Sequence, residues 1–263
     1  MPSLRGDLSS VPTTSAVPAT TGVTVLDRDT GQVTEQLNPD LPFRSASVVK
    51  LLIVLDFLWD RGPAYELPAE DRARLEVMLR SSDDDAASYY WDELGGGAIV
   101  NRMVRRLGLT HTTRPPATHP GFWGYVAITA ADTVRIYQYL LDQAPAPVGA
   151  FVMGHLHQAT RYGTDGFDQY FGIASAFSGD FSIKQGWSGF PGSGRSRPSD
   201  GLDLTSEALH TTGTVGPGDR AIVAVYTLHP VGTPYEQAYA AVTELVRTLD
   251  IPGAPKPGVP DHE

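Results

Sequence analysis

Only three residues of this chain are lysines, and two of them stand in patterns that could activate a serine. Arginine supplies the other seventeen of the twenty basic residues. The three are Lys50, Lys184 and Lys256. Arginine stays protonated in proteins, whereas the pKa of a lysine can fall far enough for its amine to accept a proton. Lys50 follows Ser47 in Ser-Val-Val-Lys, and Lys184 opens Lys-Gln-Gly. This use of lysine points to chemistry at the two positions.

The spacing of Ser47 and Lys50 suits a nucleophile and its base. A serine hydroxyl is a weak nucleophile until a nearby base accepts its proton. Residues three apart on a helix share one face, so Lys50 can reach Ser47 if a helix begins there. Such a helix would also direct its positive end at the negative charge that develops during attack. The residues that follow are apolar almost all round, which predicts a central helix over 47–60.

The other elements are expected from periodicity and turn signals. Alternating residues on both sides of Asp29-Thr30-Gly31 predict a hairpin over 22–37. Further helices are expected over 68–80, 98–107, 129–143 and 148–159, the third of them opened by a capping box, Thr-Ala-Ala-Asp at 129–132. Strands are expected over 181–187, 204–215 and 221–228, and a last helix over 235–249.

This order predicts an α+β fold, in which a five-stranded antiparallel sheet with flanking helices carries an all-helical subdomain at about 47–175. We expect one domain over 22–251. The segment 1–21 is rich in Ser, Thr, Pro and Ala, and 252–263 is rich in proline, so both are expected to be flexible tails.

Composition excludes several function classes. The formal net charge of −10 argues against nucleic acid and against anionic membranes as partners. Cysteine is absent, which excludes disulfides and thiolate chemistry. The seven histidines show no metal-ligand spacing, and no apolar run is long enough to span a bilayer. No signal peptide is visible, so we expect an extracytoplasmic location if a targeting segment was removed and a cytoplasmic one otherwise.

Three short motifs occur along the chain in the order in which a known enzyme family has them. They are Ser47-Val48-Val49-Lys50, Ser82-Asp83-Asp84 at the expected end of a helix, and Lys184-Gln185-Gly186 on an expected strand. The set resembles the S-x-x-K, S-D-N and K-T-G signatures of the class A β-lactamases and penicillin-binding proteins. The opening hairpin and Leu94-Gly95-Gly96 resemble the same family. The resemblance covers residues 22 to 250 and marks a divergent member.

The resemblance implies a role for each matched residue. Ser47 would form an acyl-enzyme, Lys50 would be its base, and Ser82 would relay a proton to the leaving group. The backbone N–H groups of Ser47 and Trp187 would form the oxyanion hole, and Lys184 would anchor a substrate carboxylate. The substrate-binding set that it implies is Asp84, Lys184, Gln185, Gly186 and Trp187. It implies no cofactor and no metal.

Departures from the family pattern bear on activity. Asp84 replaces an Asn, so a group that only accepts hydrogen bonds replaces one that both donates and accepts them, and its charge should raise the pKa of Lys50 and repel anionic substrates. Gln185 replaces a Thr or Ser whose hydroxyl meets the substrate carboxylate in the family. The first two motifs lie closer together than in typical class A enzymes, which indicates a missing loop. No Asp or Glu occurs between Glu93 and Asp132, so the glutamate that activates the deacylating water is missing.

Together these features predict a serine-nucleophile acyl hydrolase or acyltransferase that acts on a small-molecule, peptide or ester acyl donor and turns over β-lactams poorly. The alternative is a non-catalytic scaffold of the same fold that binds peptidoglycan-like ligands or a protein partner. Asp84 and Gln185 favour the alternative, and the two retained lysines oppose it. The stretch 189–201 with Arg195 and Arg197 fits either a mobile rim of the site or a solvated loop.

Overall fold

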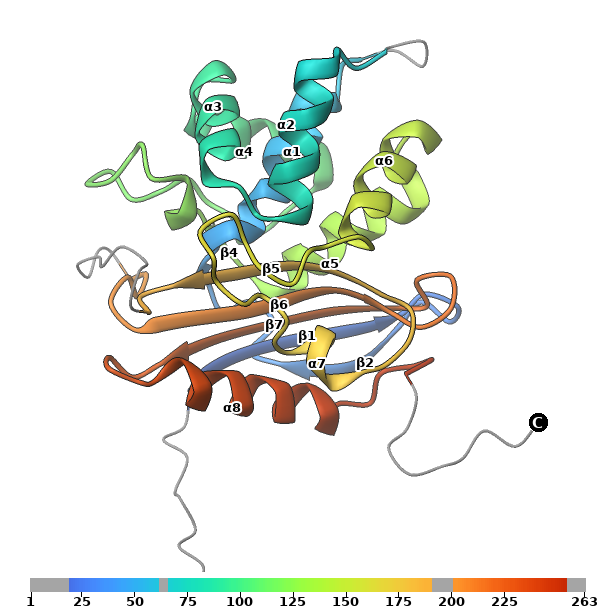
Figure 1. Ribbon diagram of the computed structural model, residues 1–263, viewed down its shortest axis with the longest axis vertical. Coiled ribbons are helices and arrows are strands. Elements are labelled where there is room, and N and C mark those ends of the chain that lie inside the picture. Colours follow the sequence, from blue (N-terminus) through green and yellow to red (C-terminus); the bar gives the residue numbers. More distant parts are fainter. Residues whose placement is uncertain (1–18, 62–65, 191–200, 255–263) are drawn as a thin grey trace, which may run out of the picture.

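The computed structural model describes residues 19–61, 66–190 and 201–254. Most of both expected tails, and the greater part of 189–201 with its two arginines, lie outside these ranges. The described chain forms an antiparallel five-stranded sheet in the order β2-β1-β7-β6-β5. Its strands are β1 (Thr20–Asp27), β2 (Gln32–Leu37), β5 (Phe181–Ser188), β6 (Glu207–Val215) and β7 (Ala221–His229). Helix α8 (Tyr235–Thr248) covers one face, and a cluster of helices stands on the other (Figure 1). The predicted α+β architecture is confirmed.

The helical cluster is built around α1 (Lys50–Leu58), in which every residue is buried. The other helices are α2 (Ala69–Arg80), α3 (Asp84–Glu93), α4 (Gly97–Leu107), α5 (Ala130–Gln138), the π-helical η3 (Tyr139–Gln143) and α6 (Ala146–Leu156). One hydrophobic core joins α1 to the sheet, since Ile222, Ala224 and Tyr226 of β7 belong to it. The continuous core holds the start of α1 fixed relative to the sheet.

Several short elements were not predicted because their patterns are too short to read. They are the 3-10 helices η1 (Ala46–Val49) and η2 (Trp123–Tyr125), α7 (Ile173–Ala176), and a second sheet of β3 (Phe43–Arg44) and β4 (Ala127–Ile128). The predicted helix over 47–60 therefore opens with a 3-10 turn. Strand β6 begins three residues later than predicted, because the Asp203 carboxylate accepts hydrogen bonds from the backbone of Thr205 and Ser206 and turns the chain there.

The prediction that Ser82-Asp83-Asp84 ends a helix is wrong. Helix α2 ends at Arg80, and the motif opens α3, which was not predicted. Asp83 is the N-cap, and its carboxylate accepts a hydrogen bond of 2.7 Å from the backbone N–H of Ala86. Aspartate is among the best N-cap residues, whereas it has no role at a helix C-terminus. The second motif thus occupies the sharp junction between two helices.

The capping box at 129–132 is confirmed at its first residue, where the Thr129 hydroxyl accepts from the backbone N–H of Asp132 at 3.1 Å. The Asp132 carboxylate, however, binds a neighbouring loop. It accepts from the backbone N–H groups of Thr110 and His111, at 3.0 and 2.9 Å, and from the Thr112 hydroxyl. Asp132 therefore anchors the segment that leads toward η2. Within the described residues, no helix has the length and apolar character needed to cross a membrane.

Candidate active site

The segment that carries Ser47 is placed by the small sheet and by the edge strand β5. After β3, the backbone N–H of Ser45 donates to the Val126 carbonyl at 2.8 Å, and Ala46 takes a positive φ of 44°. On β5, a Cβ added to Gly186 would lie 2.9 Å from the Ser45 carbonyl oxygen. Only glycine lets the strand approach so closely. Gly186 therefore acts through packing, which brings the β5 backbone against the start of η1.

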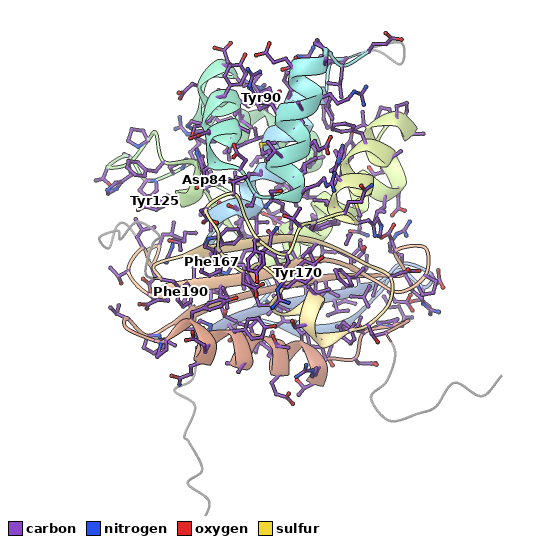
Figure 2. The ribbon with its side chains drawn as sticks, viewed as in Figure 1. Asp84, Tyr90, Tyr125, Phe167, Tyr170 and Phe190 are labelled. Carbon is purple, nitrogen blue, oxygen red and sulfur yellow. The ribbon has the colours of Figure 1, made fainter. Side chains whose placement is uncertain are left out.

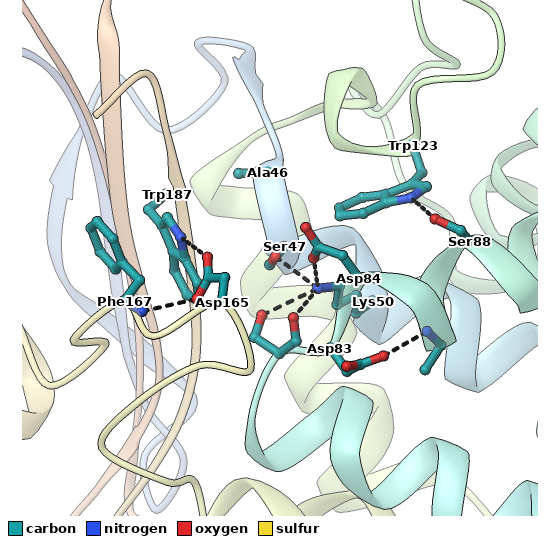
Figure 3. Close-up of polar contacts among 12 residues, drawn as sticks. Ala46, Ser47, Lys50, Asp83, Asp84, Ser88, Trp123, Asp165, Phe167 and Trp187 are labelled. Carbon is teal, nitrogen blue, oxygen red and sulfur yellow. Dashed lines mark hydrogen bonds and ion pairs between the residues drawn. The ribbon is translucent and has the colours of Figure 1, made fainter. Parts of the chain in front are cut away.

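Ser47 lines a cleft, and Lys50 lies directly beneath it (Figure 3), where its amine also contacts Ser82. The Lys50 ammonium nitrogen lies 3.0 Å from the Ser47 hydroxyl and 3.3 Å from the Ser82 hydroxyl. It also lies 2.5 Å from the Ser82 carbonyl oxygen and 2.6 Å from Oδ1 of Asp84. Lys50 is fully buried, and the described residues place these four oxygen atoms around its amine. The i, i+3 spacing read from the sequence thus brings the nucleophile candidate and the base candidate together.

Lys184 completes this group from the sheet side. Its ammonium nitrogen lies 2.8 Å from the Ser82 hydroxyl, which therefore bridges the two lysines. Lys184 is 1% exposed and makes no ion pair with any carboxylate of the described chain. Ser82 itself has a positive φ of 56°, an uncommon conformation for a residue with a side chain. Strain of this kind clusters at functional sites.

Burial controls the charge of both lysines. Loss of hydration lowers the pKa of Lys50 below its ordinary value, and the Asp84 carboxylate opposes part of that fall. The pKa of Lys184 is lowered well below its ordinary value by burial first and then by the positive charge of Lys50. Lowered lysine pKa values are the condition for a neutral amine that accepts a proton. The expected effect of Asp84 on Lys50 has the predicted sign but is smaller than that of burial.

Asp84 reaches the cleft from the first turn of α3. Its side chain is 65% exposed while that of its partner Lys50 is 0% exposed, so the ion pair joins the cleft to the buried group beneath it. Figure 2 shows Asp84 at the lower end of the helical cluster and Phe167 beside the sheet. A molecule that enters the cleft therefore meets the Asp84 carboxylate, where the family pattern has an amide that can also donate hydrogen bonds.

Gln185 does not line the cleft. Its side-chain amide donates to the backbone carbonyls of Gln169 and Phe171, at 3.0 and 2.8 Å, and the residue is fully buried. Successive side chains of a strand point to opposite faces, so Gln185 faces away from the side that Lys184 occupies. The expectation that it meets substrate does not fit this position. Instead, Gln185 ties β5 to the loop that precedes α7.

The cleft has a volume of about 480 Å³ and opens above Ser47. Its aromatic lining residues are Phe122, Trp123, Tyr125 and Trp187, and its polar ones include Ser47, Asp84, Ser88, Asp165 and Ser188. Trp123 and Trp187 stand on opposite sides of the Ser47–Lys50 group (Figure 3). Ser88 fixes Trp123 by accepting a hydrogen bond of 3.2 Å from its indole N–H. The described residues hold no cluster of histidine and carboxylate side chains suited to a metal ion.

Asp165 is the site residue that sequence reasoning missed. Its Oδ2 accepts from the Trp187 indole N–H at 3.1 Å, and its Oδ1 accepts from the backbone N–H of Phe167 at 3.0 Å. The loop that carries it is joined to the second motif, because the backbone N–H of Thr164 donates to the Ser81 carbonyl. Only the turn signal Asp165-Gly166 marked the segment, and nothing in the sequence set it beside Trp187.

Comparisons with known proteins agree with this architecture. The β-lactamase from Streptomyces albus G shares 21% identity, with a TM-score of 0.60 over 88% of this chain and 94% of that one. A β-lactamase from Desulfarculus baarsii shares 17% identity, with a TM-score of 0.62 over 87% of this chain and 91% of that one. No family model matches the sequence.

A closer sequence relationship is found among mycobacterial proteins. The chain is 36% identical over 241 residues to a protein of Mycobacterium tuberculosis (strain H37Rv) that bears the name "Putative lipoprotein LppW". The match covers 89% of this chain and 71% of the relative, and the Mycobacterium bovis protein of the same name matches equally. The chain therefore belongs to the LppW family, and it is a divergent member of the class A β-lactamase-like fold.

Proposed function

We propose that this protein is a serine-nucleophile acyl hydrolase or acyltransferase that works through an acyl-enzyme on Ser47. One observation carries the proposal: the amine of Lys50, buried and with a lowered pKa, lies 3.0 Å from the Ser47 hydroxyl. A base within hydrogen-bond reach is the first requirement for activating a serine. Ser82, between Lys50 and Lys184, supplies a path for the proton.

The proposed acylation step follows from these contacts. Neutral Lys50 accepts the hydroxyl proton while Oγ of Ser47 bonds to the acyl carbon. The bond from that carbon to the leaving group then breaks, and the proton passes through Ser82 to the leaving group. In the second half, water or another acceptor bonds to the acyl carbon, its proton returns by the same route, and the Ser47 Oγ–carbon bond breaks.

The oxyanion hole is proposed to consist of the backbone N–H groups of Ser47 and Trp187. Strand β5 is an edge strand, so one row of its backbone groups is not used in the sheet. The close approach at Gly186 places that edge beside η1. Donors held by the backbone need no reorganisation as charge develops on the carbonyl oxygen.

Slow deacylation of β-lactams is part of the proposal. The stretch from Leu94 to Ala131 contains no carboxylate, although it contributes η2 and its aromatic residues to the cleft. The carboxylates that do line the cleft are already engaged. Asp84 pairs with Lys50, and Asp165 binds Trp187 and the Phe167 backbone.

Covalent labelling tests this function. A fluorophosphonate should add to the protein at Ser47, where the Oγ–phosphorus bond forms and fluoride leaves. Mass spectrometry should locate the adduct on the peptide that contains Ser47, and Ser47→Ala should abolish it. Lys50→Met should slow labelling by two to three orders of magnitude, about the contribution of a general base. A folded protein that never labels at Ser47 would contradict the proposal.

A non-catalytic scaffold is the second candidate, and the Lys50–Asp84 ion pair favours it. An anion 2.6 Å from the amine favours the protonated lysine, which cannot act as a base. In that case the cleft would bind a peptidoglycan-like ligand or a protein partner without turnover. Labelling measured up to alkaline pH separates the two candidates. If Lys50 is the base and is only protonated near neutral pH, the labelling rate of Ser47 should rise as the pH is raised, whereas a non-catalytic scaffold should not label at any pH.

A further inference from the structure

The cleft above Ser47 offers acceptors and aromatic faces to an incoming molecule, while Lys50 and Lys184 lie beneath its floor. Lys50 and Lys184 are 0% and 1% exposed, and both are bonded within the protein. The charged side chains that line the cleft in the described chain are Asp84 and Asp165. A substrate carboxylate placed against either wall would meet a like charge, which is costly in a partly desolvated cleft.

Asp165 is the better placed of the two for recognition. Its carboxylate is held by two donors, the Trp187 indole N–H and the backbone N–H of Phe167, and neither donor carries a charge. Among the described residues no cationic side chain pairs with it, whereas the nearby Asp168 is paired with Arg161. The negative charge of Asp165 is therefore fixed in position and left without a counter-ion from this part of the chain.

Aromatic rings complete the lining around this charge. Trp187 stacks on Phe167 with centroids 4.8 Å apart and an interplanar angle of 5°, so the indole next to Asp165 has one orientation. On the opposite wall, the Trp123 ring has the Lys50 ammonium nitrogen 4.8 Å from its centroid. At the rim, Phe122 stacks on Tyr125, and Phe122 is 57% exposed. Ring faces attract cations, most of all ammonium groups with little hydration.

We propose that the site takes acyl donors whose acyl part carries an ammonium group, and that Asp165 with the surrounding aromatic rings is the specificity determinant. This inference rests on the function proposed above and names its substrate class. The ammonium group would lie in the cleft while the acyl carbon meets Ser47. Asp84 adds to the same preference, because a carboxylate at the start of α3 accepts hydrogen bonds and cannot donate them.

Three nitrophenyl esters of equal chain length test the inference. One ends in trimethylammonium, one in the neutral tert-butyl isostere, and one in a carboxylate. In each, the Ser47 Oγ–acyl bond forms, nitrophenolate leaves, and the hydroxyl proton passes to Lys50 and then to solvent. The measured quantity is kcat/KM, with Ser47→Ala subtracted as background. We expect the cationic ester to exceed its isostere by about tenfold at low salt, and less at high salt.

Two variants test whether Asp165 causes the preference for the cationic ester. Asp165→Asn should lower the ratio of cationic to neutral kcat/KM by about fivefold, the size of one partly exposed ion pair. Asp85→Asn is the matched control, because it removes the same charge from an exposed residue of α3 that does not line the cleft. It should leave the ratio as in the wild type.

The two levels of the proposal fail in different ways. If all three esters acylate Ser47 but the cationic one has no advantage, or Asp165→Asn and Asp85→Asn behave alike, the charge preference is overturned and the acyl-transfer function stands. If no ester forms an adduct on Ser47 by mass spectrometry, the acyl-transfer function fails, and the substrate preference fails with it.

Discussion

The replacement of Asp84 by asparagine tests the largest departure of this site from the family pattern. The Asp84 carboxylate lies 2.6 Å from the Lys50 amine, and its side chain is 65% exposed. Because Lys50 is fully buried, the dielectric of water gives a lower bound on the attraction. At 2.6 Å it gives roughly 1.6 kcal/mol of attraction. Asp84→Asn removes this attraction and should therefore lower the pKa of Lys50 further.

The sign of this change determines the kinetic outcome. An anion favours the charged lysine, so its removal favours the neutral amine that serves as base. Below both pKa values, the neutral fraction of Lys50 should rise about tenfold. The second-order rate constant for fluorophosphonate labelling of Ser47 should rise by the same factor near neutral pH. The plateau of the pH–rate profile should be reached at lower pH than in the wild type, with a similar plateau rate.

The assay compares the wild type, Asp84→Asn and the control Asp85→Asn over a pH series. Asp85 neighbours Asp84 on α3 but does not line the cleft, so its variant should keep the wild-type profile. An unchanged Asp84→Asn profile would show that Lys50 is not the base, and a shift to higher pH would refute the electrostatic reasoning. Loss of labelling in a folded variant would show that Asp84 is itself required for acylation.

Three further predictions concern the strand contact, a buried histidine and turnover. Gly186→Ala should lower the free energy of unfolding in urea by about 1–3 kcal/mol and slow the labelling of Ser47, because the new Cβ would lie 2.9 Å from the Ser45 carbonyl oxygen. An unchanged free energy of unfolding would mean that η1 can move away from β5. Burial lowers the pKa of His210 to about 3, and its ring accepts from the backbone N–H of Thr227. The pKa of a histidine in the unfolded chain is about 6.5, so the unfolded chain takes up a proton below that pH while the folded protein does not. The contribution of His210 to the free energy of unfolding is therefore fully present above about pH 6.5 and is lost as the pH falls toward about 3. In His210→Gln, the free energy of unfolding should therefore decrease less steeply between about pH 6.5 and 4 than in the wild type. If it decreases equally steeply, other groups cause the decrease. A chromogenic cephalosporin should be turned over far more slowly than about ten per second and leave a persistent adduct on Ser47, whereas fast turnover would require an unrecognised deacylation base.

The parts of the fold that follow from local patterns were predictable. The apolar runs of α1 and β7 and the hairpin of β1 and β2 each carry their own signal, and the i, i+3 relation of Ser47 and Lys50 needs only a helix. The position of Gln185 was also readable, since strand alternation separates it from Lys184. The family pattern indicates the opposite, because it has a Thr or Ser here whose hydroxyl meets the substrate carboxylate, whereas Gln185 is buried against backbone carbonyls.

Other features depend on contacts that a single sequence does not display. Asp165 reaches the cleft because its loop is tied to Ser81 and Trp187, residues far away along the chain. The opening of α3 was missed because its helical pattern is weak and Asp83 was read as an ending. Strands β3 and β4 span two residues each, too few for any periodicity, although they hold Ser47 in place.

The close contact between Gly186 and the segment before Ser47 has a consequence for solubility. Strand β5 forms one margin of the sheet, and exposed strand margins can pair with those of other molecules and lead to aggregation. Here η1 lies against that margin, with the Ser45 carbonyl oxygen close to the glycine. The segment that presents the nucleophile also shields the strand from intermolecular pairing. Substitutions that loosen it should therefore promote self-association as well as impair chemistry.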